Sequence, residues 1–325
     1  MKKLRKLFFI LILLSGSNTF AAKTSKLSPF ELWKQNFIDR SSKKGLSKSF
    51  LIKQLKNIKY QPSIIDKDRN QVTSSTKINY PTWIKKWIGH KPTRIQKGKA
   101  NLKKYDAILT DIEKRYGVDK EIIVSLWGVE TLYGKIMGKY KIIESLTTLA
   151  FDKRRRAFFE NELLSALIII KEGHIKKKDF LGSWAGAMGQ CQFMPSSFLK
   201  YAQDYDGDGK KDIWTNKKDI FASIANFLKK ADWKKNKSIG LLVNKKGVKK
   251  RFEIQERRSP SNYNKLGVRL LNGRLLKGKW KRRAAVISHK NSPLILRGSN
   301  YETIMKWNRS SLFAALNIML MDAFK

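Results

Sequence analysis

The stretch that decides the fold reads LWGVETLYG and occupies residues 126–134. If a helix begins near Asp119, its apolar residues recur at helical spacing, and Glu130 lies one turn beyond Leu126 and Trp127 on the same face. A carboxyl there either pairs with a basic group or is desolvated, and desolvation raises its pKa. A general acid working near neutral pH needs a raised pKa, so Glu130 is the candidate catalytic residue. The alternative is a boundary glutamate that reaches solvent past its neighbours.

A second informative stretch reads GSWAGAMGQCQFMPSS and occupies residues 182–197. Its glycines and alanines leave a backbone with little bulk, suited to the close approach of a ligand or of another helix. Ser183 and Gln192 carry polar groups that can bond sugar hydroxyls or an N-acetyl group, which makes them candidate binding residues. Tight helix packing is the alternative interpretation of the small residues.

Together the two stretches resemble the membrane-bound lytic transglycosylase B family, whose lysozyme-like enzymes cleave the glycan strands of peptidoglycan. The resemblance rests on VETLYG at 129–134 and on residues 182–197, and LTTLAF at 146–151 and WNRS at 307–310 match as well. It runs from about Ile65 to Ala323, most of the chain. It implies a mainly α fold (α+β), in which a lysozyme-like helical catalytic core carries a small β-rich module and flanking helices.

The resemblance and the changing texture of the chain predict five segments. Short alternating apolar runs, broken by Gly and Asn, mark the β-rich part. The segments are a signal peptide at 1–21, an N-terminal helical region at 22–100, a lysozyme-like catalytic core at 101–235, a small β-rich module at 236–297, and a C-terminal helix at 298–325 that packs on the catalytic region.

The N-terminus predicts export. Four basic residues between positions 2 and 6 precede an apolar run from Leu7 to Leu14, and small or polar residues follow up to Ala21. This is the pattern of a secretory signal peptide, and the run is too short to span a bilayer, although a retained anchor is the alternative. We expect a periplasmic protein with no stable membrane anchor. Cys191 is the only cysteine, so no internal disulfide forms.

The chain is strongly basic. Removal of residues 1–21 lowers its formal net charge by four, from +43 to +39. Such a charge attracts polyanions, namely nucleic acid, anionic lipid or the cell envelope. The lysines are spread along the whole chain, so a compositional bias is an equally good interpretation. Because the export signal argues against nucleic acid, we expect none as a partner.

The family resemblance implies a mechanism with a single glutamate, here Glu130. It would protonate the glycosidic oxygen between N-acetylmuramic acid and N-acetylglucosamine, and then remove the proton from the muramoyl C6 hydroxyl. That hydroxyl attacks C1 in place of water and leaves a 1,6-anhydro end, so the second carboxylate of other glycosidases is not needed. The partner would be peptidoglycan strands, with cell-wall synthesis or division proteins as further candidates. A hydrolytic muramidase and a non-catalytic peptidoglycan-binding protein are the alternatives.

Further substrate-binding residues are implied by matching positions. Arg154 and Arg155 match an arginine pair that the family places two residues before an aromatic pair, and they could contact the lactyl carboxylate or the peptide stem. An exposed basic turn is the alternative. Asn308 matches an asparagine on the C-terminal helix. The full implied set is Ser183, Gln192, Arg154, Arg155, Asn308, Tyr133, Phe158 and Phe313.

Four positions depart from the family pattern. Phe158 and Phe313 stand where tyrosines are often found, Gln190 stands where a tyrosine is common, and Cys191 stands where glycine is usual. The lost hydroxyls would weaken individual sugar contacts, but they leave the proposed acid in place.

A third stretch, DYDGDGKKD at 204–212, reads as the first part of an EF-hand loop. Its aspartates occupy ligand positions 1, 3, 5 and 9, and glycine occupies position 6. Position 12 is Thr215, and the next acid, Asp219, would need a longer loop. We expect a structural Ca²⁺ or Na⁺ site and no cofactor required for catalysis; the alternative is an Asp/Gly turn without metal. The candidate ligands are Asp204, Asp206, Asp208 and Asp212.

Overall fold

The computed structural model describes residues 27–71, 79–89, 91–244, 253–287, 289 and 291–325. The signal peptide predicted at 1–21 lies outside these residues. Across the described ranges, no helix combines the length and the apolar character needed to cross a membrane.

Helices dominate the N-terminal half of the chain. Several begin at a short polar side chain that accepts a hydrogen bond from an amide three residues on, as Ser28, Ser47 and Thr93 do. The elements are α1 (Pro29–Ser42), α2 (Lys48–Leu55), α3 (Pro62–Arg69), α4 (Tyr80–Ile88), α5 (Arg94–Lys104), α6 (Asp106–Tyr116), α7 (Lys120–Thr131), β1 (Tyr140–Lys141), α8 (Ile142–Phe151) and α9 (Arg156–Lys171).

The C-terminal half mixes helices with short strands. Its elements are η1 (Lys177–Asp179, a 3₁₀ turn), β2 (Leu181–Gly182), α10 (Pro195–Tyr201), α11 (Lys217–Lys230), β3 (Gly240–Asn244), α12 (Pro260–Lys265), β4 (Arg269–Leu270), β5 (Ala284–Val286), β6 (Leu294–Arg297), α13 (Tyr301–Trp307) and α14 (Ser311–Phe324).

Helix α7 is the centre of the helical body. It packs against α5, α6, α11 and α14, and every residue from Ile122 to Gly128 is buried. On its α14 side, Ser125 Oγ donates a 2.7 Å hydrogen bond to Asn317 Oδ1, and both residues are fully buried. Since buried polar groups must be paired, this bond fixes α7 against α14.

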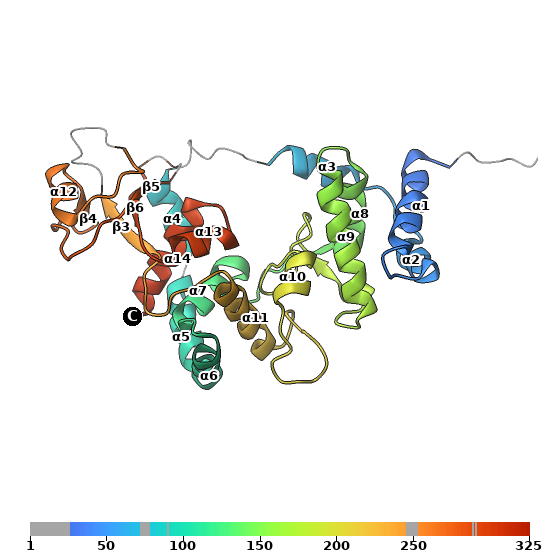
Figure 1. Ribbon diagram of the computed structural model, residues 1–325, viewed down its shortest axis with the longest axis horizontal. Helices are drawn as coiled ribbons and strands as arrows, with labels where there is room; N and C mark the ends of the chain where they lie inside the picture. Colours follow the sequence, from blue (N-terminus) through green and yellow to red (C-terminus); the bar gives the residue numbers. More distant parts are fainter. Residues whose placement is uncertain (1–26, 72–78, 90, 245–252, 288, 290) are drawn as a thin grey trace, which may run out of the picture.

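Helices α1 and α2 lie at one end of the molecule, beside α8 and α9 (Figure 1). Glu160 on α9 connects them to the body. Its carboxylate accepts hydrogen bonds from Trp33 Nε1 at 3.1 Å and from Arg40 Nη2 at 2.8 Å. Aromatic side chains of α1 also pack against Phe151 at the end of α8, with a ring separation of 5.2 Å from Phe30.

A four-stranded antiparallel sheet of order β4-β3-β6-β5 lies at the opposite end (Figure 1). Gly240 in β3 joins it to the helices, because a Cβ there would lie only 2.7 Å from Ile295 and 3.2 Å from Ile318 of α14. The sheet has a small core of its own, made of Val243, Tyr263, Val268, Leu276, Ala284, Leu294 and Leu296.

The mainly α fold with a small β-rich module is confirmed. The sheet strands fall within the predicted 236–297 segment, and α13 and α14 return to helix after it. The boundaries of the five segments stay a prediction.

Gly128 generates the first testable prediction. A Cβ at this position would lie 2.6–2.7 Å from the Tyr133 ring, which packs against α7. We expect Gly128→Ala to destabilise the fold by about 1–3 kcal/mol through overpacking, even though alanine favours helix. In a Tyr133→Ala background the same substitution should be neutral or stabilising, which denaturant unfolding of the double-mutant cycle measures. Equal costs in both backgrounds would contradict the steric explanation.

Candidate active site

Glu130 lies in the last turn of α7, directly before a left-handed bend in the backbone. Leu132, Tyr133 and Gly134 have φ values of 52°, 60° and 84°. A Cβ at Gly134 would lie 2.4 Å from the Gln190 side chain, so only glycine fits there. The chain therefore turns sharply away after Thr131, and Glu130 lies one residue before the end of the helix.

The Glu130 carboxyl has one hydrogen-bond donor among the described side chains. Trp307 Nε1, at the end of α13, donates to Glu130 Oε1 at 2.8 Å. The last turn of α7 contains no basic residue, and no lysine or arginine in the described part of the chain contributes to the pKa of Glu130. Of the two possibilities that the sequence leaves open, pairing with a cation or desolvation, the structure shows desolvation.

Burial raises the pKa of Glu130 to about 7, and the Trp307 hydrogen bond acts in the opposite direction by favouring the charged form. A carboxyl with this pKa holds its proton through much of the neutral range and releases it readily, as general acid–base catalysis requires.

Gln190 connects the two informative stretches of the sequence. It is buried, and its Oε1 accepts a hydrogen bond from Trp127 Nε1 at 2.8 Å while its Nε2 donates to the Trp214 carbonyl at 2.6 Å. Its own carbonyl accepts a 3.1 Å bond from Thr131 Oγ1. The Gln190 amide therefore fixes the Glu130 end of α7 against the following loop.

Residues 182–193 form a compact loop of close backbone contacts. A Cβ at Gly182 would lie 2.3 Å from the Ala187 carbonyl oxygen, and one at Gly138 would lie 2.1 Å from the Gly182 oxygen. These glycines therefore permit close backbone contacts in and around the loop. Ser183 Oγ accepts the Ala187 amide at 2.9 Å, and Gln192 Nε2 donates to the Met137 and Gly189 carbonyls at 3.1 Å each.

Trp307 connects the loop at 182–193 and the C-terminal helices to Glu130. Its ring lies 5.5 Å from Phe193 and 4.7 Å from Phe227 between ring centroids. The neighbouring Asn308 is exposed at the end of α13, whereas Phe313 is buried in the first turn of α14. Asn308 is thus the more accessible of these two predicted binding residues.

Tyr133 and the arginine pair have structural partners. Tyr133 donates a 2.7 Å hydrogen bond to the Arg94 carbonyl, which anchors the bend after α7. Arg154 Nε and Arg155 Nη2 donate to the Asp68 carboxylate at 2.9 and 2.6 Å, and Asp68 is buried at the end of α3. These bonds connect α3 to the start of α9, where Phe158 is 47% exposed.

The acidic loop groups a different set of carboxylates from the one that the spacing predicts. Asp204, Asp206 and Asp219 each offer an oxygen within 4.8 Å of the others. Asp208 and Asp212 are absent from this group; Asp212 accepts the Trp214 and Thr215 amides at 2.8 and 2.9 Å instead. Asp219 reaches the loop because it sits in the first turn of α11.

Burial raises the pKa of Asp219 to about 6, and the negative charges of Asp206 and Asp204 raise it further, against two backbone amides that lower it. Three converging carboxylates and no nitrogen or sulfur ligand make a donor set that fits a hard cation such as Ca²⁺.

A helical body whose central helix ends at one desolvated glutamate, covered by a glycine-rich loop, defines a lysozyme-like transglycosylase fold. The chain belongs to the family described as "Transglycosylase SLT domain", which matches residues 29–321. The predicted resemblance to lytic transglycosylases is thereby confirmed.

The chain is also similar in sequence and in structure to individual lytic transglycosylases. The chain is 36% identical over 220 residues to the membrane-bound lytic murein transglycosylase B of Escherichia coli (strain K12), a match that covers 65% of this chain and only 60% of that relative. SltB3 from Pseudomonas aeruginosa, in complex with NAG-anhNAM-pentapeptide, superimposes with a TM-score of 0.78 at 32% identity, covering 91% of this chain and 79% of SltB3. Slt35 of Escherichia coli, in complex with calcium, gives 0.74 at 29% identity, covering 90% and 92%.

Sequence reasoning missed two residues of the site. Trp307 was noted only as part of a matching motif, and Gln190 only as a departure from the family pattern. A signal for Trp307 was available, since an aromatic residue with an N–H donor stands directly before the predicted binding residue Asn308.

The Trp307 hydrogen bond generates a prediction about pH. Trp307→Phe removes a donor that favours the carboxylate, so the pKa of Glu130 should rise above 7 and the alkaline limb of kcat/KM should move to higher pH. Trp233→Phe is the matched control, because its indole N–H bonds the buried carboxylate of Asp119 instead. It should lower the melting temperature and leave the pH profile in place. An alkaline limb that is unmoved in Trp307→Phe would contradict the role given to this bond.

Proposed function

We propose that this protein is a peptidoglycan lytic transglycosylase that cleaves the β-1,4 bond between N-acetylmuramic acid and N-acetylglucosamine and leaves 1,6-anhydromuramic ends. The observation that carries the proposal is the Glu130 carboxyl, half-buried at the end of α7 with a pKa raised by desolvation to about 7 and bonded only by Trp307 among the described residues.

In the first step, protonated Glu130 donates its proton to the glycosidic oxygen. The bond from that oxygen to C1 of the muramoyl sugar breaks, and the N-acetylglucosamine end leaves with a free 4-hydroxyl. The muramoyl centre acquires oxocarbenium character, and the newly formed Glu130 carboxylate is stabilised by the N–H of Trp307.

In the second step, the Glu130 carboxylate takes the proton of the C6 hydroxyl while the C6 oxygen bonds to C1. The glutamic acid is regenerated and no water is consumed. No neighbouring carboxylate contributes to the raised pKa of Glu130 among the described residues. This supports the scheme, because a mechanism that activates water needs a second carboxylate.

Substrate contacts are proposed for the residues around this carboxyl. Ser183 and Gln192 lie on the loop that leads to Phe193 and the Trp307 ring, and Asn308 is exposed beside it. Phe158, which is 47% exposed, is proposed as a further substrate contact. Arg154 and Arg155 are about half exposed while bonded to Asp68, so they can present positive charge to a peptide stem without losing that partner.

We also propose that the acidic loop holds a structural Ca²⁺ through Asp204, Asp206 and Asp219. The convergence of the three carboxylates supports it, and the calcium complex of Slt35 concerns a relative that covers most of this chain. The ion would offset the repulsion that raises the pKa of Asp219, and it takes no part in bond cleavage.

Export to the periplasm is part of the same proposal. It rests on the basic residues and the apolar run of the N-terminal sequence, and it places the enzyme in the compartment of its substrate.

Glu130→Gln tests the proposed reaction. Because glutamine cannot transfer the proton, release of 1,6-anhydro products from purified sacculi should fall by at least about 10²–10⁴-fold. Mass spectrometry of the released muropeptides measures both the rate and the product. Glu144→Gln is the control, since Glu144 pairs with Lys141 on the surface and should be dispensable. Turnover near that of the wild type in Glu130→Gln would refute the assignment, and reducing ends in place of anhydro ends would identify a hydrolytic muramidase.

The calcium site can be tested by thermal unfolding. At a hundredfold excess over its Kd, Ca²⁺ should stabilise the fold by about 2.7 kcal/mol and raise the melting temperature. Asp219→Asn should abolish that response, whereas Asp208→Asn should keep it, because Asp208 lies outside the cluster. A melting temperature that ignores both Ca²⁺ and chelator would support the metal-free turn.

A further inference from the structure

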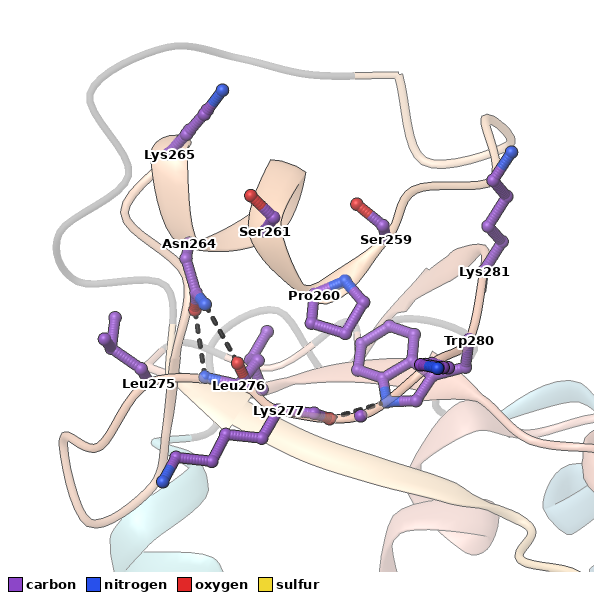
Figure 2. A pocket seen from close by; sticks show the side chains of 12 residues that line it. Ser259, Pro260, Ser261, Asn264, Lys265, Leu275, Leu276, Lys277, Trp280 and Lys281 are labelled. Atoms are coloured by element: carbon purple, nitrogen blue, oxygen red, sulfur yellow. Dashed lines mark hydrogen bonds between the residues drawn. The ribbon is translucent and has the colours of Figure 1, made fainter.

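A hollow opens on the β-rich module, and none of its lining residues belongs to the site around Glu130. It has a volume of about 1020 Å³ and lies between α12 and residues 275–281 (Figure 2). We call it the α12 hollow. Its place on the module separates it from the helices that position the catalytic carboxyl.

Hydrogen bonds hold the walls of the α12 hollow in place. The Asn264 side chain donates to the Leu276 carbonyl and accepts from the Leu276 amide, both at 2.9 Å (Figure 2). Tyr263, on the same helix, donates to the Arg282 carbonyl at 2.9 Å and belongs to the core of the module. A preformed hollow loses little conformational freedom when a ligand enters it.

One wall of the hollow is apolar. The Trp280 ring stands beside Pro260 (Figure 2), and its indole N–H is used by the Lys277 carbonyl at 2.9 Å. The indole donor is therefore used within the wall, and the half-buried ring, which lies beside Tyr263 and under the Arg282 guanidinium, presents only part of its surface. An aromatic surface of this kind packs against the C–H face of a sugar or against methyl groups.

The rim of the hollow is positively charged. Four exposed lysines, called the lysine rim below, lie around it, and in the described part of the chain none of them has an ion-pair partner and no acidic side chain lines the hollow. Lysine ammonium groups are flexible point charges, suited to carboxylates whose positions are not fixed. The lysine rim consists of Lys265, Lys277, Lys279 and Lys281.

We propose that the α12 hollow is an accessory site for the carboxylate-bearing peptide stems of peptidoglycan. The lysine rim pairs with the stem carboxylates, and the Trp280 wall takes the methyl or sugar C–H groups next to them. Binding here keeps a strand near Glu130 by raising its effective concentration. The inference rests on the proposed function, and it accounts for charge that the reaction itself does not use.

The charge of the lysine rim favours a carboxylate-bearing strand as the occupant, and a lipid surface is the competing one. The hollow is an open depression bounded on one side by α12. A lipid surface would instead contact two exposed apolar side chains of the module. These are Leu271 and Leu275, which are 58% and 52% exposed. Vesicle binding is therefore the competing outcome that the experiment must separate.

The test replaces the lysine rim by glutamine in a Glu130→Gln background, so that sacculi are bound and not degraded. The matched control replaces four other exposed lysines, Lys43, Lys44, Lys176 and Lys178. Both variants lose the same charge. The affinity for sacculi, measured by co-sedimentation, should fall on the order of tenfold for the rim variant. Each exposed ion pair is weak, but the four lysines of the rim contribute together. For the control the affinity should fall less than about twofold, because diffuse charge is screened.

Sacculi stripped of their stems by an amidase provide the chemical test. On them the rim variant and its parent should bind equally. Equal losses for rim and control variants, or a difference that persists without stems, would overturn the proposal. Binding to phosphatidylglycerol vesicles that depends on the rim, with sacculus binding unchanged, would assign the surface to lipid. Anhydro products formed from short soluble glycans by the Glu130-containing protein test the proposed function separately.

Discussion

The candidate site depends on desolvating the Glu130 carboxyl without placing a cation beside it. Desolvation and a nearby positive charge shift a carboxyl pKa in opposite directions, and one close cation lowers it by about 1–3 units. A lysine beside Glu130 would therefore cancel the shift that makes it an acid at neutral pH. In a chain with 69 basic and 26 acidic residues, leaving this position free of lysine is a constraint on the whole fold. The neutral N–H of Trp307 stabilises the carboxylate more weakly, so the pKa stays near 7.

Three segments that are far apart in the sequence together provide a desolvated carboxyl without a neighbouring cation. Helix α7 is surrounded by other helices, the loop at 182–193 closes over its end, and α13 supplies the indole donor. Gln190 couples the first two, since its amide bonds both Trp127 and the Trp214 carbonyl. A tyrosine hydroxyl has one donor and one acceptor, whereas the glutamine amide reaches two separate partners with distinct atoms. The departure from the family pattern at this position thus has a local physical reason.

The sequence predicts the parts of this arrangement that depend on local pattern. Helical spacing identifies α7 and the apolar face of Glu130, and alternating short runs identify the sheet. It does not predict partners that arrive from far along the chain. Trp307 lies 177 positions from Glu130, and Asp68 lies 86 positions from Arg154. The acidic loop shows a further limit of prediction from sequence. EF-hand spacing selects Asp212 as a ligand, whereas the first turn of α11 brings Asp219 into the cluster.

The large positive charge and the neutral chemistry of Glu130 are compatible because they are separated in space. At physiological ionic strength the field of an exposed lysine extends about 8 Å, while buried groups respond mainly to their immediate neighbours. Among the residues that the structure describes, no basic residue contributes to the pKa of Glu130, even though exposed lysines occur on many surface elements. The surface charge can therefore vary with little effect on the proton transfer. Binding to an anionic polymer, as proposed for the lysine rim, and proton transfer at Glu130 consequently depend on different residues of this fold.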